Sequence, residues 1–431
     1  MPTPRTWLPL ITVCLGAFML ITDTTVVTVA LPDLATGLHA SLAQQQWVLN
    51  SYTLILAVLA LSAGSFGDRY GQLRVFRVSV ALFGLASLCC AIAPGIGLLI
   101  AARCGQAVGG AALLTTAMSL LGTCYTDRDR GIAFGVFTAA LGVAGSLGPI
   151  VGGLLTEAFT WRAIFVINAP LALITLTLTR TIRQQTALRN GPARLDLPGM
   201  FTFAIATGSL TYALISAKPV LLVIAAPALA AFVLIERRTA APMLDPRLFT
   251  DRSFAAIMFG VLTGAAVFAE LIYASLWLQS AGRLGPIPAG LAMMPMAVAL
   301  FSASTFIGKR LTTLPARLTL PAGALLAAIG SALNWLLLGN ALTLLPGLVL
   351  TGLGLGIAGP ATSTAIMAVV PPERAGMAAG AMGTVRQLGQ ALGVALLGLV
   401  YPAGIGLVYL LTSAVALLGA VAMWIGSADH E

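Results

Sequence analysis

The feature that most constrains this chain is a series of long apolar segments that recurs from one end to the other. A helix needs roughly 20 apolar residues to cross a lipid bilayer, and we identify fourteen such segments, separated by short stretches with Pro, Gly, Arg and Asp. They are residues 7–31, 45–66, 76–94, 96–123, 132–156, 161–180, 197–217, 219–236, 253–279, 288–308, 319–338, 341–369, 376–400 and 404–426. The sequence therefore predicts an all-α integral membrane protein with 14 transmembrane helices.

The composition excludes a water-soluble globule. Hydrophobic residues make up 58% of the 431 residues and charged residues only 9%, whereas soluble proteins carry about 25% charged residues. The net charge of +9 does not indicate nucleic acid, because the basic residues are dispersed without interleaved aromatic residues. The five Cys lie in or at the ends of apolar segments, with neither a C-x-x-C spacing nor a His cluster. We therefore expect no disulfide and no metal site.

The basic residues predict the orientation, because cytoplasmic loops carry an excess of Lys and Arg. With the N-terminus in the cytoplasm, eighteen basic residues lie in cytoplasmic loops and only Arg162, Lys218 and Arg283 lie outside. Both termini are then cytoplasmic, as an even number of spans requires. The first apolar segment carries Asp23 and runs to Leu31 without a cleavage-like end, so we interpret it as a span rather than a signal peptide.

Two short motifs recur at nearly the same distance along the chain. Residues 67–74 are similar to residues 308–317, and residues 129–135 are similar to residues 373–380, with offsets of 241 and of 244 or 245 residues. Transporters are often built from duplicated halves. The offsets predict an N-terminal six-helix bundle at 1–180, a linker with two extra helices at 181–252, and a C-terminal six-helix bundle at 253–431.

Four ionisable residues lie well inside predicted spans, namely Asp23, Arg103, Glu270 and Arg386. Placing each of them at the centre of a membrane helix costs on the order of 2.5–3.5 kcal/mol. We therefore expect each of these residues to have a role that offsets this cost. At about 1.5 Å per residue, Asp23 and Arg103 lie roughly 10–12 Å below the outer surface, and Glu270 lies about 13 Å below it. The depths of Asp23 and Arg103 match, while Arg386 lies toward the cytoplasmic half.

Two helical faces place further groups beside these charges. Arg103, Gln106 and Gly110 share one stripe of the fourth span. A carboxylate in such a place can exchange a proton for a ligand, because its protonation responds to water access. The alternative interpretation is that Asp23 and Arg103 form a purely structural ion pair.

The ninth span carries the second face, on which Glu270, Tyr273 and Trp277 lie together. A carboxylate flanked by aromatic rings suits a lipophilic or cationic ligand. The alternative is that a nearby hydroxyl satisfies Glu270.

A glycine stripe occupies the fifth span, with Gly145, Gly148, Pro149 and Gly152 on one face and Gly153 beside them. Small residues and a proline permit close helix contact and a local bend. This pattern indicates either a hinge or sealing surface, or simple packing.

Together these residues resemble the major facilitator superfamily, and more closely its fourteen-span drug:proton antiporter branch. The resemblance covers nearly the whole chain. It rests on residues 23–32 (DTTVVTVALP), on Gln46-Trp47 through Tyr52, on residues 64–74, on Arg103 with Gln106 and Gly109-Gly110, on the run Gly148-Pro149-x-x-Gly152-Gly153, and on residues 386–390 (RQLGQ).

The resemblance implies two six-helix bundles that rock around a central cavity. It also implies that Asp23 and Arg103 take part in proton coupling, and that the glycine run marks exporters rather than importers. The cytoplasmic gate contact it implies is formed by Gly67, Asp68, Arg69, Gly71 and Arg74. The chain departs from the family at Thr28, Gln72 and Ala144, where the family has Asn, a basic residue and a further Gly. Glu270 matches no family motif, so its role rests on the physical argument.

We therefore expect a secondary active transporter, a proton-coupled antiporter that exports small lipophilic, cationic or amphipathic compounds by alternating access. The residues expected to contact the substrate are Glu270, Tyr273, Trp277, Gln106 and Arg386, and those expected to couple protons are Asp23, Arg103 and Glu270. The alternatives are a dedicated exporter of one endogenous metabolite or antibiotic, and a membrane sensor that only binds partners. No nucleophile–base or metal-ligand constellation accompanies the buried carboxylates, so we do not expect an enzyme. We expect a monomer in the bacterial inner membrane, without a cofactor, whose partners are a small-molecule substrate, protons and lipid.

Overall fold

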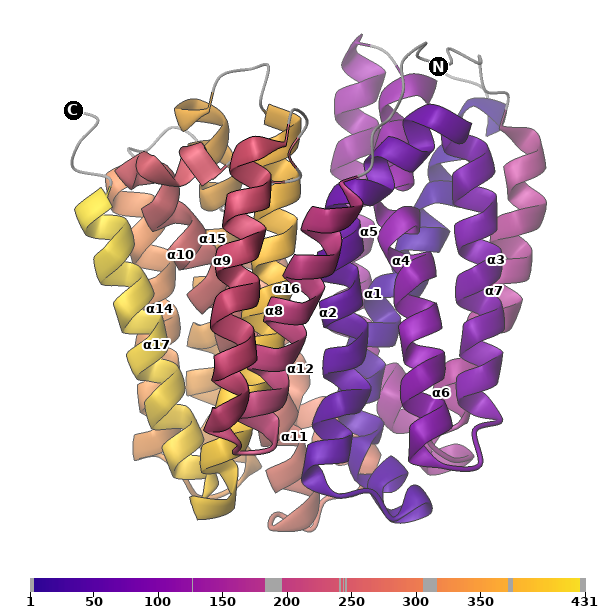
Figure 1. Cartoon of the computed structure of the whole chain (residues 1–431). Coiled ribbons are helices and arrows are strands. Elements are labelled where there is room, and N and C mark those ends of the chain that lie inside the picture. Colours follow the sequence, from indigo (N-terminus) through magenta and orange to yellow (C-terminus); the bar gives the residue numbers. More distant parts are fainter. Residues whose placement is uncertain are drawn as a thin grey trace. The chain divides into compact units, whose positions relative to one another are not determined.

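Helices form all the regular structure that the computed structural model describes, in residues 4–125, 127–182, 196–239, 242, 244, 246–304, 316–370 and 375–426 (Figure 1). The chain divides into two compact units, residues 1–195 and residues 196–431. The predicted all-helical fold is confirmed for these ranges.

The first unit is built of long helices joined by short connections. Its described elements are α1 (Pro4–Leu38), α2 (Leu42–Tyr70), α3 (Gln72–Ala91), α4 (Ile96–Cys124), α5 (Asp127–Ala158), α6 (Ala163–Val166), α7 (Asn168–Leu178) and η1 (Thr179–Thr181). Helix α1 packs on α5, α2 packs on α4, and α3 packs on both α4 and α7. Apolar side chains such as Phe76, Phe83 and Leu113 form the core among these helices.

The second unit contains the remaining helices. Its described elements are α8 (Leu197–Ile215), η2 (Pro219–Leu221), α9 (Leu222–Arg238), η3 (Pro246–Thr250), α10 (Arg252–Phe268), α11 (Glu270–Ser280), α12 (Pro286–Ser302), α14 (Ala316–Leu336), α15 (Ala341–Val369), α16 (Ala375–Val400), η6 (Tyr401–Ala403) and α17 (Ile405–Gly426). Helix α14 packs on α15 and α17, α10 packs on α16 and α17, and α12 packs on α15. Helix α8 pairs with α9 and also contacts α16.

Side-chain caps explain where several helices begin. At α2, the backbone N–H of Gln44 donates to Ser41 Oγ at 3.3 Å, and the backbone N–H of Ser41 donates to Gln44 Oε1 at 2.8 Å. Asn340 and Thr343 form the same reciprocal arrangement at the start of α15. At α10, the Asp251 carboxylate accepts a hydrogen bond from the backbone N–H of Phe254 at 2.9 Å. These caps satisfy backbone donors that the first turn leaves unpaired.

Each predicted span overlaps one helix or a run of two or three consecutive helical segments. Within the described residues, eleven helical segments are long and apolar enough to cross a membrane, and α12 is shorter. The predicted spans 45–66 and 376–400 lie within α2 and α16. The total of fourteen crossings, their grouping, and the separate status of residues 181–252 remain predictions.

Two predicted spans are interrupted in the structure. Span 161–180 consists of α6, α7 and η1, and span 253–279 is divided at Ala269 into α10 and α11. At the second break, the N–H groups of Ala269 and Ile272 bond to carbonyls three residues earlier, both at 3.1 Å. The helix therefore tightens locally, and Glu270 becomes the first residue of α11.

Candidate functional site

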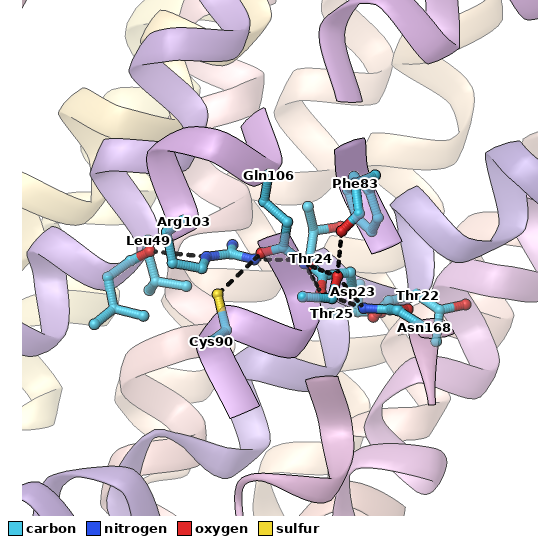
Figure 2. A network of polar contacts seen from close by, with 12 residues as sticks. Thr22, Asp23, Thr24, Thr25, Leu49, Phe83, Cys90, Arg103, Gln106 and Asn168 are labelled. Carbon is cyan, nitrogen blue, oxygen red and sulfur yellow. Dashed lines mark hydrogen bonds and ion pairs between the residues drawn. The ribbon is translucent and has the colours of Figure 1, made fainter. Parts of the chain in front are cut away.

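A buried ion pair lies at the centre of the first unit. Arg103 Nη1 on α4 donates to Asp23 Oδ2 on α1 at 2.5 Å, and both side chains are 1% exposed (Figure 2). It is the one ion pair among the residues that the structure describes. The matched depths predicted from the sequence thus correspond to direct contact. A charge buried in a membrane protein is costly unless it is paired. The ion pair therefore holds α1 and α4 together at the depth of these two residues.

Neutral polar groups complete the coordination of the Asp23 carboxylate. Asp23 Oδ1 accepts from Gln106 Nε2 and from Asn168 Nδ2, each at 2.9 Å. Ser87 Oγ on α3 in turn accepts from Gln106 Nε2 at 2.7 Å and from Asn168 Nδ2 at 3.3 Å. Helices α1, α3, α4 and α7 therefore converge on one network, shown in close-up in Figure 2.

Arg103 is held by more than its counter-charge. Its Nη1 also donates to Gln106 Oε1 at 2.7 Å, and its Nε donates to the backbone carbonyl of Val48 on α2 at 3.2 Å. The guanidinium carbon lies 4.1 Å from the centroid of the Tyr52 ring, within the range of a cation–π contact. The cation thus links α1, α2 and α4.

Gln106 was predicted to contact substrate, and the structure places it inside this network. Its amide accepts from Arg103 and from Cys90 Sγ, and donates to Asp23 and Ser87. The side chain is fully buried. In this arrangement the amide serves the ion pair, and contact with substrate remains a prediction.

The sequence reasoning missed Asn168, Ser87 and Cys90. All three are neutral, and neutral polar residues inside an apolar span give a much weaker signal than charges do. An amide within the apolar segment 161–180 is the one signal that points to Asn168.

Glu270 lies in a second buried polar cluster, within the second unit. Its carboxylate accepts from Ser331 Oγ at 2.5 Å and from Asn334 Nδ2 at 3.1 Å, both on α14. Glu270 is 0% exposed. The hydroxyl contact agrees with the alternative interpretation drawn from the sequence, in which a neighbouring hydroxyl satisfies the carboxylate.

The aromatic residues expected beside Glu270 are placed differently. The Tyr273 hydroxyl donates to the Val394 carbonyl on α16, and its ring lies 5.2 Å from that of Tyr401. Tyr273 is fully buried and Trp277 is half-buried. Contact of these rings with a ligand remains a prediction, because periodicity identifies the face of a helix but not the neighbour that covers it.

Arg386 lies eleven residues after the start of α16, and its side chain is exposed. Within the described part of the chain it forms no ion pair. Cations inside membrane spans face protein interiors or water-filled cavities rather than lipid. Contact of Arg386 with a substrate remains a prediction.

The predicted gate residues lie on both sides of the junction between α2 and α3. Gly71 is the single residue between these helices and has φ of 90°, a left-handed value that L side chains rarely adopt. Gly67 is buried against the Gln72 side chain, and Arg74 is exposed. Outside the described residues lie the side chains of Asp68 and Arg69 and the ranges 183–195, 305–315 and 371–374.

The glycine stripe lies in α5 where that helix meets α1. A Cβ at Gly152 would lie 2.9 Å from the Val26 carbonyl, and one at Gly148 would collide with the Thr25 side chain. Gly145 lies nearby, 3.8 Å from Ile21 by the same measure. On the same helix, Pro149 and Gly153 are both buried. These contacts show close packing of α5 on α1, and a hinge or sealing role remains a prediction.

Known proteins resemble the chain over nearly its full length. Residues 13–394 match the family model described as Major Facilitator Superfamily. The chain is 34% identical over 410 residues to the multidrug resistance protein Stp of Mycobacterium tuberculosis, covering 92% of this chain and 76% of that protein. It is 37% identical over 417 residues to the puromycin resistance protein pur8 of Streptomyces alboniger, covering 93% and 82%.

A solved structure shares the fold at low sequence identity. The peptide transporter POT, crystallised in complex with sulfate, matches with a TM-score of 0.72 and 14% identity, over 97% of this chain and 94% of its own. At this identity, the similarity describes the fold alone.

Proposed function

Because this chain belongs to the Major Facilitator Superfamily, we propose that it exports small lipophilic drugs or antibiotics in exchange for protons, with Asp23 and Arg103 as the coupling site. The chain is a multi-pass membrane transporter. The observation that carries the proposal is the ion pair buried at 1% exposure in the first unit. Breaking a buried pair by removing one partner costs about 3–5 kcal/mol. A proton that breaks this pair would therefore strongly change the free energy of packing between the helices that the pair joins.

The hydrogen-bond inventory explains how a proton would act. An ionised carboxylate only accepts hydrogen bonds, whereas a protonated one carries an O–H donor. Asp23 now accepts from three donors, on Arg103, Gln106 and Asn168. A proton on either oxygen places a donor against at least one of these donors. The network must therefore rearrange, and Arg103 loses the negative charge that balances it.

Such a rearrangement couples protonation to helix movement. Arg103 bonds both to α1, through Asp23, and to α2, through the Val48 carbonyl. When the pair on α1 is lost, the restraint between these helices changes. We expect the protonated and ion-paired forms to favour different orientations of the transporter, with cargo and proton moving in opposite directions.

Outward transport of drugs is supported by the names of the relatives. Stp is named a multidrug resistance protein and pur8 a puromycin resistance protein, and resistance follows when a compound is expelled. Arg386 contributes an exposed cation for polar groups of the cargo, and Glu270 is a second candidate for proton coupling. We place the protein as a monomer in the bacterial inner membrane with both termini in the cytoplasm.

The test uses the purified full chain in proteoliposomes with an acidic lumen and a pH-sensitive dye. We expect cationic and amphipathic compounds, puromycin included, to release luminal protons. Asp23→Asn should abolish this release, while Glu157→Gln, which changes an exposed residue of α5, should behave as the wild type. Proton release by no compound of a broad panel, or the same release from Asp23→Asn, would refute the proposed mechanism.

The same panel decides between multidrug export and a dedicated exporter. The relative pur8 carries the name of a single antibiotic, which favours the second possibility. Competition among unrelated compounds supports multidrug export, and one tight ligand with no competitors supports a dedicated exporter.

A further inference from the structure

Two aromatic rings lie beside the guanidinium group of Arg103. Its central carbon is 4.1 Å from the centroid of the Tyr52 ring on α2 and 5.9 Å from that of the Phe165 ring on α6. A cation within about 6 Å of a ring centroid is attracted by the negative face of the ring. Tyr52 and Phe165 are both 0% exposed, so water does not screen this attraction. Arg103 therefore has a source of stabilisation besides Asp23.

Two uncharged oxygens also hold the guanidinium group. Arg103 Nη1 donates to Gln106 Oε1 at 2.7 Å, and Nε donates to the Val48 carbonyl at 3.2 Å. Neither bond requires Asp23 to be ionised, so both can persist after this carboxylate takes up a proton. They satisfy donors of Arg103 but supply no negative charge to balance it.

Within the described part of the chain, no other ionised side chain is placed to replace Asp23, because its pair with Arg103 is the one ion pair there. The titratable groups that interact electrostatically with Arg103 or with its neighbours are Asp23 on α1, Tyr52 on α2, Cys89 and Cys90 on α3, and Cys104 on α4. Phenols and thiols ionise only in alkaline solution, and Phe165 on α6 and Asn168 on α7 do not titrate. Once Asp23 is protonated, the rings are the main electrostatic partner that the cation retains.

We propose that Tyr52 and Phe165 are positioning residues that hold Arg103 in place when Asp23 takes up a proton, and that they thereby set the pH at which the ion pair breaks. This inference rests on the proposed function, in which protonation of Asp23 breaks the pair. A guanidinium group without a counter-charge is costly inside a membrane span. A desolvated cation–π contact offsets part of that cost, so the cation can stay at its site.

The rings favour the protonated form of Asp23 over the ionised form. In the ion pair, the carboxylate already neutralises much of the guanidinium charge, so the attraction of the rings matters less. After protonation, the uncompensated positive charge faces the rings. Removing a ring therefore destabilises the protonated form more than the ion-paired form. The proton affinity of Asp23 should then fall, and its protonation should require a lower pH.

The ring of Tyr52, rather than its hydroxyl, is the part that acts on Arg103. The hydroxyl has no hydrogen-bond partner among the described residues, although buried hydroxyls are normally bonded. Tyr52→Phe therefore keeps the ring and removes no hydrogen bond described here. Tyr52→Leu removes the ring and leaves an apolar side chain. The two variants separate the contribution of the ring from that of the hydroxyl.

The test measures protonation of Asp23 in the purified full chain in lipid nanodiscs, without a transport substrate. Infrared difference spectra record the carbonyl stretch of protonated carboxyl groups as the pH is lowered, and the band of Asp23 is assigned by its absence in Asp23→Asn. We expect Tyr52→Leu to move the midpoint of this band by about one pH unit toward acid, which is an about tenfold loss of proton affinity. Tyr52→Phe should keep the wild-type midpoint.

Two further variants complete the test. Phe165→Leu should move the midpoint in the same direction but by less, because its ring lies farther from the guanidinium carbon. It also provides the measurement if Tyr52→Leu does not fold. Phe76→Leu is the matched control and should leave the midpoint unchanged. Phe76 is fully buried in the same unit, but on α3 it lies eleven residues before Ser87, which is about 16 Å along the helix.

Three results would overturn the proposal. The first is a wild-type midpoint in Tyr52→Leu, or in Phe165→Leu where Tyr52→Leu does not fold. The second is an equal shift in the ring variants and in Phe76→Leu, which would show a general loosening of the unit. The third is the absence of the Asp23 band at every pH at which the wild type stays folded, because the state that the rings are proposed to stabilise would then not form.

The outcome is separable from that of the proposed function, because the spectra are recorded on protein at rest. The midpoint can depend on the rings in a chain that releases no protons for any compound of the panel. In the opposite case, Asp23→Asn abolishes drug-driven proton release while Tyr52→Leu keeps the wild-type midpoint. The proposed function would then stand, and only the role of the rings would fail.

Discussion

Replacing Arg103 with leucine would leave the Asp23 carboxylate buried without its counter-charge. The pair is 1% exposed on both sides, so solvent cannot take over the role of the guanidinium. Removing one partner of a buried pair costs about 3–5 kcal/mol. Two amide donors, on Gln106 and Asn168, still bond to Asp23 Oδ1 in this variant. We therefore expect a loss of unfolding free energy near the lower end of that range.

The reciprocal change is informative because its cost has a different origin. In Asp23→Asn, one carboxylate oxygen becomes an NH₂ donor. Turned one way, this donor faces Arg103, and turned the other way it faces Gln106 and Asn168. In either orientation, the new NH₂ group faces other hydrogen-bond donors. A buried group left unsatisfied in this way costs about 1–3 kcal/mol. The double variant Asp23→Asn with Arg103→Leu removes both the uncompensated charge and one competing donor.

The assay is a double-mutant cycle on thermal unfolding of the purified protein in detergent, with the folded fraction read by size-exclusion chromatography. For a unit of this size, a loss of about 3–5 kcal/mol corresponds to roughly 6–20 °C in Tm. We expect the double variant to be more stable than the sum of the singles by about 2 kcal/mol. A loss below about 1 kcal/mol in Arg103→Leu, together with simple additivity, would refute the reasoning.

Four further substitutions test the packing and the coupling. Gly152→Ala sets a methyl group 2.9 Å from the Val26 carbonyl and should cost about 1–3 kcal/mol in the same unfolding assay. Gly208→Ala, in a helix with no atom within 4 Å of the added group, should instead stabilise by up to about 1 kcal/mol; equal effects of the two would contradict the packing argument. Gly71→Ala forces a side chain into a φ of 90° and should lower stability by about 1–2 kcal/mol, and unchanged melting would show that the junction relaxes without strain. Asn168→Leu removes one donor from the carboxylate and should move the pH profile of substrate-driven proton release while leaving drug binding intact; an unchanged profile would exclude Asn168 from coupling.

The sequence was sufficient to predict the helical membrane fold and the Asp23–Arg103 contact. Long apolar segments have no other stable form in lipid than helices or closed barrels. A charge inside such a segment is costly enough that two opposite charges at the same depth have a strong reason to meet. The depth calculation needed only the helical rise and the loop positions.

The partners of these charges depend on packing that the sequence does not express directly. Asn168 and Ser87 reach Asp23 from two other helices, and their contact follows from which helices are neighbours. The same holds for Tyr273, whose helical face was identified but whose hydroxyl bonds to the Val394 carbonyl. An amide in an apolar segment is a weaker sequence signal than an isolated charge, but Asn168 and Asn334 both donate to a buried carboxylate.

The single-residue junction at Gly71 has a mechanical consequence. Helix α2 has 29 residues and so extends about 44 Å from this point. A tilt of about 10° at the junction would carry the far end of α2 sideways by about 8 Å. A small rotation at this one-residue junction would thus become a displacement of several ångströms at the other end of the helix.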